Sequence, residues 1–131
     1  MSWRILVADD DREIGTLIAT ILRKGPHTVT ICSDAESALV ELGRGGAGYD
    51  LLVTDFTLPG RSGIELIAAV RATPATAAMP IVMISAHGSE AMDARAKTAG
   101  ADAFLNKPFT VSQLRTTVRM LLDPLHAAGR G

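Results

Sequence analysis

Three consecutive aspartates close the first apolar segment of the chain. Residues 5–8 are Ile-Leu-Val-Ala, and Asp9, Asp10 and Asp11 follow directly. Two carboxylates about 5 Å apart repel each other by roughly 3 kcal/mol at an effective dielectric constant near 20. A cation among them would remove that cost, and oxygen-only ligands suit Mg²⁺ or Mn²⁺. The run therefore predicts a divalent metal site at Asp9 and Asp10, with Asp11 capping the helix that follows.

The chain contains five short apolar segments, which alternate with stretches whose apolar residues have helical spacing. The segments span residues 5–8, 29–32, 51–54, 81–85 and 103–106. The first, third and fourth are nearly continuous apolar runs, which is typical of central strands in a parallel sheet covered on both faces. The helical spacing is clearest in Ile14, Leu17, Ile18, Ile21 and Leu22, and again in Leu114, Val118, Leu121 and Leu122. Five βα units predict one doubly wound α/β domain.

Local signals fix where several helices start. Ser33…Glu36, Ser62…Glu65 and Thr110…Gln113 each have the spacing of a capping box. Residues 43–48 match G-x-G-x-x-G, but they follow a helix and precede a strand, the reverse of a dinucleotide site. We interpret that stretch as a loop.

Composition excludes several classes of protein. The 131 residues are 47% hydrophobic, which suits one globular domain with a real core. Thirteen basic and fourteen acidic residues give a net charge of −1 without a Lys/Arg cluster, so we expect no direct DNA binding.

The single cysteine, Cys32, fits a reducing compartment, and no apolar run approaches the ~20 residues that span a bilayer. The N-terminus also lacks the pattern of a signal peptide. We expect a cytoplasmic protein with no membrane segment. His27 and His126 are expected to be solvated, and no histidine or cysteine pair predicts a zinc site.

The carboxyl ends of the predicted strands carry polar residues that could act together. Ligands bind beyond these ends in open α/β sheets, and here they present Asp9 and Asp10, then Asp55, Ser85 and Lys107. A cation among the carboxylates, with an ammonium and a hydroxyl as donors, makes a pocket for a phosphoryl group. Asp55 is the natural nucleophile, because a carboxylate can accept phosphoryl as an acyl phosphate.

Taken in order, these motifs resemble the receiver domain of two-component response regulators. The resemblance rests on Asp9-Asp10, Asp55 with Pro59-Gly60 and Gly63, Ser85-Ala86, and Lys107-Pro108-Phe109, and it covers residues 4–122. It implies a flavodoxin-like parallel sheet of five strands in the order 2-1-3-4-5. It also implies a receiver domain at residues 1–122, followed by a flexible C-terminal tail at residues 123–131.

The resemblance assigns roles by position. Asp55 would be the phosphoacceptor, and Mg²⁺ (or Mn²⁺) would be held by Asp10, Asp55 and the Thr57 backbone carbonyl, with Asp9 acting through a metal-bound water. Lys107 and Ser85 would bind the phosphoryl oxygens, and a cis bond between Lys107 and Pro108 would aim the lysine. Thr57 and His87 would flank the attacking water and tune the lifetime of the phosphoryl group.

Phe104 occupies the position of the family's switch aromatic, where Tyr is frequent. Phe has no hydroxyl that needs a partner, and leaving its ring exposed forfeits roughly 1.5–3 kcal/mol of burial. Our hypothesis is that Phe104 favours the inward state, or is covered by a partner, even before phosphorylation.

The implied function is a phosphorylation switch in two-component signalling. The phosphoryl donor would be a sensor histidine kinase or a histidine phosphotransfer protein. The acyl phosphate would switch the face formed by the fourth helix, fifth strand and fifth helix, which would meet a downstream protein target, a fused output domain or a second copy in a homodimer. The chain would catalyse its own phosphorylation and dephosphorylation as a signalling domain rather than a turnover enzyme. A standalone regulator, a phosphorelay intermediate and an excised receiver all fit.

Two other functions compete with this one. A receiver-like interaction module that signals without phosphorylation usually lacks an acidic residue, the acceptor or the lysine, and none is missing here. A haloacid-type aspartyl phosphatase needs a second aspartate two residues after the nucleophile, where this chain has Thr57. We set the phosphatase aside and keep the interaction module as the alternative.

Overall fold

The computed structural model describes residues 3–25, 27–43, 48–86 and 90–127. Within them, strands and helices alternate five times, as the sequence predicts. The strands are β1 (Trp3–Ala8), β2 (His27–Cys32), β3 (Leu51–Asp55), β4 (Ile81–Ser85) and β5 (Ala103–Asn106). The helices are α1 (Arg12–Arg23), α2 (Ala35–Gly43), α3 (Gly63–Ala72), α4 (Glu90–Ala99) and α5 (Val111–Ala127).

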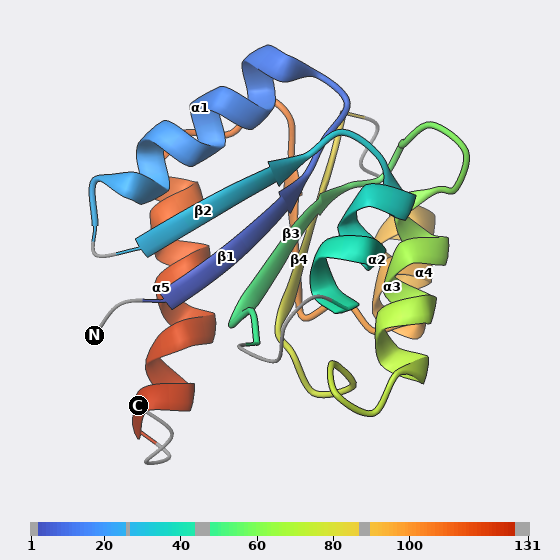
Figure 1. Ribbon diagram of the computed structural model, residues 1–131. Coiled ribbons are helices and arrows are strands. Elements are labelled where there is room, and N and C mark those ends of the chain that lie inside the picture. The colour runs from blue at the N-terminus through green and yellow to red at the C-terminus, as the bar shows by residue number, and fades with distance from the viewer. Residues whose placement is uncertain (1–2, 26, 44–47, 87–89, 128–131) are drawn as a thin grey trace.

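All five strands run parallel in the order β2-β1-β3-β4-β5, which confirms the expected topology. The register pairs Leu6 of β1 with Leu52 of β3, and Asp55 at the end of β3 with Ile84 of β4. Because the strands are parallel, their carboxyl ends meet at one edge, to which the arrowheads point in Figure 1. The predicted polar residues therefore converge on that edge.

Helices cover both faces of the sheet. Figure 1 shows α1 and α5 on one face and α2, α3 and α4 on the other. Side chains along a strand alternate between the faces, so Ile5 and Val7 pack on the α1/α5 side, and Leu6 and Ala8 pack on the opposite side. A strand buried on both faces has no polar face, which explains the continuous apolar runs.

The helix starts follow the sequence with one correction. Ser62 and Glu65 form the predicted capping box of α3, and Thr110 and Gln113 exchange the same pair of bonds before α5. The predicted pair Ser33…Glu36 is wrong by one residue. The Asp34 carboxylate accepts the Ser37 amide at 2.7 Å instead, so α2 starts at Ala35. This bond lowers the pKa of Asp34.

The C-terminal helix is longer than expected. The sequence predicts a flexible tail from residue 123, whereas α5 continues to Ala127. The apolar spacing of Val118, Leu121 and Leu122 continues at Leu125 in the sequence, which favours the extra helical turn. In the part of the chain that the structure describes, no helix has the length and apolarity to cross a membrane.

Candidate functional site

Three carboxylates meet at the carboxyl edge of the sheet. Asp9 and Asp10 follow β1, and Asp55 is the last residue of β3, the neighbouring strand. One carboxylate oxygen from each lies within 4.8 Å of the others. Asp9 is 3% and Asp55 8% exposed, whereas Asp10 is open to solvent. The cluster is thus buried at Asp9 and Asp55 and open to solvent at Asp10.

Backbone hydrogen bonds fix the position of Asp9. Its amide donates to the Cys32 carbonyl at 3.0 Å, which extends the pairing of β1 with β2. Its Oδ1 accepts the Asp11 amide at 2.8 Å. Asp11 in turn caps α1, as predicted, by accepting the amides of Glu13 and Ile14. Burial raises the pKa of Asp9, and the nearby charge of Asp55 acts in the same direction.

Lys107 provides the cation of the site. Its Nζ lies 3.3 Å from Asp9 Oδ2 and 3.2 Å from Asp55 Oδ2. Burial alone would lower the pKa of Lys107, but the charges of Asp55 and Asp9 outweigh burial, and the pKa is raised. The ammonium is therefore held in its charged form between the two buried carboxylates.

The backbone on both sides of Lys107 is also fixed. The Lys107 amide donates to the Ser85 carbonyl at 2.8 Å, which places the lysine beside the end of β4. The bond between Lys107 and Pro108 is cis, as the resemblance implied.

Two residues enclose the backbone around Asp55: Thr54, which no sequence pattern singled out, and Gly63, which the family resemblance included without a role. The buried Thr54 hydroxyl lies 3.0 Å from the Asp55 carbonyl oxygen, and the Gly63 amide donates to the Phe56 carbonyl at 2.7 Å. A Cβ at Gly63 would overlap the Asp55 carbonyl oxygen. Gly63 therefore allows the start of α3 to pack directly on the end of β3.

The remaining predicted residues lie around this centre. Ser85 is 2% exposed at the end of β4, and Thr57 is exposed two residues beyond Asp55. Phe104 is half-buried on β5, where it pairs with Met83 and packs on the α2/α3/α4 side of the sheet. His87 lies outside the described residues.

The donor set fits a hard divalent cation. It offers carboxylate oxygens alone, at mutual distances that a single ion can bridge, and one carboxylate faces solvent. Asp9, Asp10 and Asp55 form an acidic site that fits Mg²⁺. With Lys107 beside it, the site combines carboxylates, which are able to act as nucleophiles, with positive charge; phosphoryl transfer to a side chain requires both.

Comparisons with known proteins agree with this chemistry. A family model described as the response regulator receiver domain matches residues 5–119. The transcriptional regulatory protein CpxR of Escherichia coli (strain K12) is 35% identical over 123 residues, which cover 94% of this chain and 50% of CpxR. The sensory transduction protein RegX3 of Mycobacterium tuberculosis (strain H37Rv) is 30% identical over 118 residues, covering 90% of this chain and 50% of RegX3. The chain thus spans about half the length of these relatives.

Solved structures share the whole fold. The chemotaxis response regulator CheY4 of Vibrio cholerae superposes with a TM-score of 0.86 at 25% identity, covering 92% of this chain and 99% of CheY4. The receiver domain of the Francisella response regulator 1452 gives a TM-score of 0.85 at 29% identity, with 93% and 98% of the two chains covered.

Proposed function

This chain belongs to the response regulator receiver domains of two-component signalling, and we propose that Asp55 is its phosphoacceptor in an Mg²⁺-dependent transfer. The phosphoryl donor is a phosphohistidine on a sensor histidine kinase or a histidine phosphotransfer protein. The observation that carries the proposal is the position of Asp55, which lies within the carboxylate cluster and 3.2 Å from the Lys107 ammonium.

The transfer follows from these positions. A carboxylate oxygen of Asp55 attacks the phosphorus, and the bond from phosphorus to the histidine nitrogen breaks, with its electron pair leaving on the imidazole. Asp55 becomes an acyl phosphate. Lys107 Nζ, which already contacts Asp55, exchanges the carboxylate for the phosphoryl oxygens and neutralises them. The Ser85 hydroxyl binds another of these oxygens.

Asp10, Asp55 and the backbone carbonyl of Thr57 would hold the Mg²⁺, and Asp9 would reach it through water. When bound, Mg²⁺ supplies positive charge for the phosphoryl oxygens. Asp9 also has a role of its own, since its ion pair with Lys107 keeps the ammonium beside Asp55. Because Asp9 and Asp55 are buried, the cluster limits the access of water to the acyl phosphate.

The switch involves Ser85 and Phe104. Movement of Ser85 toward the phosphoryl group leaves space that the Phe104 ring fills, and the face of α4, β5 and α5 changes for its partner. The half-buried ring of Phe104 supports the hypothesis that the inward state is favoured before phosphorylation. That partner is a downstream protein, a fused output domain or a second copy of the chain.

Incubation with acetyl phosphate tests the acceptor. We expect intact-mass spectrometry to show a gain of one phosphoryl group in Mg²⁺ and none in EDTA. Asp55→Asn should show no gain. Asp123→Asn is the matched control, because it makes the same substitution on an exposed α5 residue, and it should be phosphorylated like the parent. A folded, Mg²⁺-binding protein that gains nothing from any donor would instead favour the phosphorylation-independent interaction module.

The lifetime of the acyl phosphate gives a second test. Substituting Thr57 or His87 should change the rate of hydrolysis without preventing phosphorylation, because neither supplies the nucleophile or the cation. Decay of the phosphorylated protein is followed by intact mass after the donor is removed. Unchanged decay in both variants would contradict the lifetime roles.

A further inference from the structure

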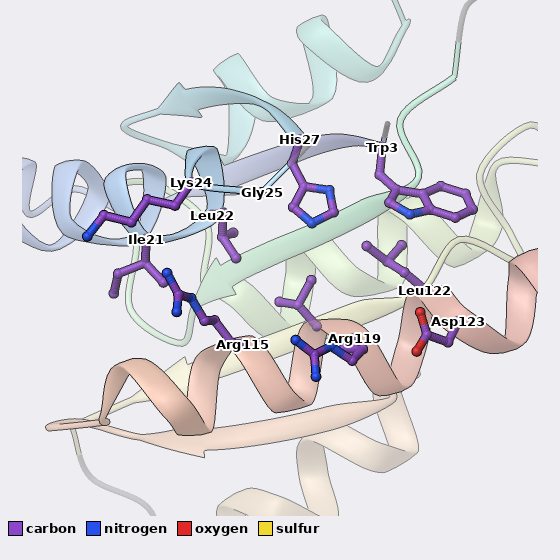
Figure 2. Close-up of a pocket in the computed structure, with 11 residues that line it drawn as sticks. Trp3, Ile21, Leu22, Lys24, Gly25, His27, Arg115, Arg119, Leu122 and Asp123 are labelled. Carbon is purple, nitrogen blue, oxygen red and sulfur yellow. The ribbon is translucent and has the colours of Figure 1, made fainter. Parts of the chain in front are cut away.

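A second pocket lies at the opposite edge of the sheet, where the strands begin. It has a volume of about 540 Å³, within the roughly 300–1,000 Å³ that small-molecule sites occupy. Figure 2 shows it between the end of α1, the starts of β1 and β2, and the middle of α5. Its lining residues are Trp3, Ile21, Leu22, Lys24, Gly25, His27, Arg115, Val118, Arg119, Leu122 and Asp123.

The base of this pocket is apolar. Ile21 and Leu22 come from α1, and Val118 and Leu122 come from α5; all four are nearly completely buried. Trp3 adds its indole at the start of β1. The base can therefore accept a planar apolar body.

The rim is cationic. Arg115 and Arg119 are four residues apart on α5, so they share one side of the helix, and Lys24 also lines the pocket, just after α1. Within the described residues, none of these three cations forms a salt bridge. Asp123 is the single acidic lining residue, so the rim keeps a positive excess that suits a carboxylate or phosphate.

His27 adds a polar atom that lacks a partner. We expected this residue to be solvated, but it starts β2, and its Nδ1 is buried without a hydrogen bond in the described structure. Burial lowers the pKa of His27, which favours the neutral ring. The ring lies between Leu22 and Trp3 in Figure 2, where a ligand oxygen or N–H group would satisfy it.

We propose that this pocket binds a small organic anion with a planar apolar body, held by Arg115 and Arg119 at its anionic group and by Trp3 and the aliphatic base at its ring. The site is separate from the phosphoryl chemistry, because it lies where the strands begin rather than where they end. Aromatic carboxylates and nucleoside monophosphates share this chemistry.

The single tryptophan makes binding measurable. Trp3 is the one tryptophan of the chain, so energy transfer from it to bound 1-anilinonaphthalene-8-sulfonate, a planar anion, reports on this pocket. We expect saturable one-to-one binding with a dissociation constant below about 1 mM. Binding should weaken as salt increases. Absence of saturation with the folded protein would overturn the proposal.

Charge variants show whether the pocket is the site. Arg115→Gln and Arg119→Gln should each weaken binding about five- to tenfold, and Asp123→Asn should strengthen it two- to threefold, since it removes the opposing charge. Lys97→Gln on α4, on the other face of the sheet, is the control and should leave affinity unchanged. Unfolding would weaken binding in every variant, so it cannot produce weaker binding in the arginine variants together with stronger binding in Asp123→Asn. If the arginine variants fail to fold, the affinity of Asp123→Asn still tests the proposal. Equal affinity in all variants would overturn the proposal.

Competition identifies the source of the anion. Displacement of the probe by 1-naphthoate supports an aromatic carboxylate, displacement by AMP supports a nucleotide, and displacement by both supports the shared chemistry. Inorganic phosphate and neutral 1-naphthalenemethanol each lack one half of the ligand and should compete at least tenfold less well. Displacement by neither anion, or equal competition by the neutral compound, would overturn the proposal.

Discussion

Substituting Asp10 with Asn should stabilise the metal-free protein while removing its response to Mg²⁺. Asp10 is exposed, but its carboxylate lies within 4.8 Å of one oxygen each of Asp9 and Asp55. At that distance two unit charges repel by roughly 3.5 kcal/mol at a dielectric constant of 20 and by roughly 0.9 kcal/mol in water. Because Asp10 is exposed, the lower figure applies to each of its two pairs.

The net effect is smaller than the sum of both repulsions. Lys107, at 3.2 and 3.3 Å from the other two carboxylates, also attracts Asp10 and offsets part of the repulsion. We therefore expect Asp10→Asn to raise the free energy of unfolding by about 1 kcal/mol in EDTA, or the melting temperature by about 3–4 °C.

Mg²⁺ should reverse the order of stability. A ligand that binds the folded state alone stabilises it by about 2.7 kcal/mol at one hundred times its dissociation constant. The parent should gain this stability and Asp10→Asn should gain little, because Asn brings no negative charge to the ion. The variant is thus the more stable protein in EDTA and the less stable one in saturating Mg²⁺.

Urea unfolding followed by circular dichroism, in EDTA and in saturating Mg²⁺, measures both differences. Asp123→Asn removes one charge outside the cluster and should change stability by less than about 0.5 kcal/mol in either condition. The reasoning fails if Asp10→Asn is no more stable than the parent in EDTA. It also fails if Mg²⁺ stabilises both proteins equally.

Three further predictions concern the scaffold. Gly63→Ala should lower the free energy of unfolding by about 1–3 kcal/mol in urea, because the new Cβ overlaps the Asp55 carbonyl oxygen, whereas Gly43→Ala, whose Cβ would meet nothing, should not. Arg71→Met should cost about 2–4 kcal/mol in the same assay, because the guanidinium donates to the backbone carbonyls of Gly100, Ala77 and Met79; a loss below 0.5 kcal/mol would contradict this. Burial raises the pKa of the Cys32 thiol, so Ellman's reagent should label the cysteine only as the protein unfolds. Rapid labelling of Cys32 in the folded protein would contradict this prediction.

The alternation of elements could be predicted because each strand carries its own signal. Residues 5–8 and 81–84 are continuous apolar runs, and both are buried on two faces of the sheet. The order of the strands is a different matter, since pairing joins residues far apart in the chain, as Leu52 pairs with Ile81. That order came from the resemblance to a family, and the structure confirms it.

The sequence does not decide which residue caps a helix where two neighbouring residues could both do so. Ser33 and Asp34 both suit a helix cap, and the spacing to Glu36 favoured the serine. The structure uses Asp34, which accepts the Ser37 amide. A carboxylate and a hydroxyl compete for the same amides, and the path of the chain after β2 decides between them.

The site could be predicted where it depends on strand ends and not where it depends on packing between layers. Asp9 and Lys107 directly follow β1 and β5, and Asp55 ends β3, so topology alone brings them together. The roles of Thr54 and Gly63 depend on how closely α3 approaches β3, and no sequence spacing expresses that distance.

The position of Lys107 explains how a buried cluster of like charges can exist before any metal or phosphoryl group arrives. Asp9 and Asp55 are almost completely buried, and each lies near 3.3 Å from the same ammonium. One cation between two carboxylates leaves one negative charge uncompensated, and the pKa of Asp9 is raised by burial first and then by the charge of Asp55. A divalent cation at the exposed Asp10 side would compensate it. The fold thus holds an acidic site whose negative charge is not fully compensated, and that excess would favour binding of a divalent cation.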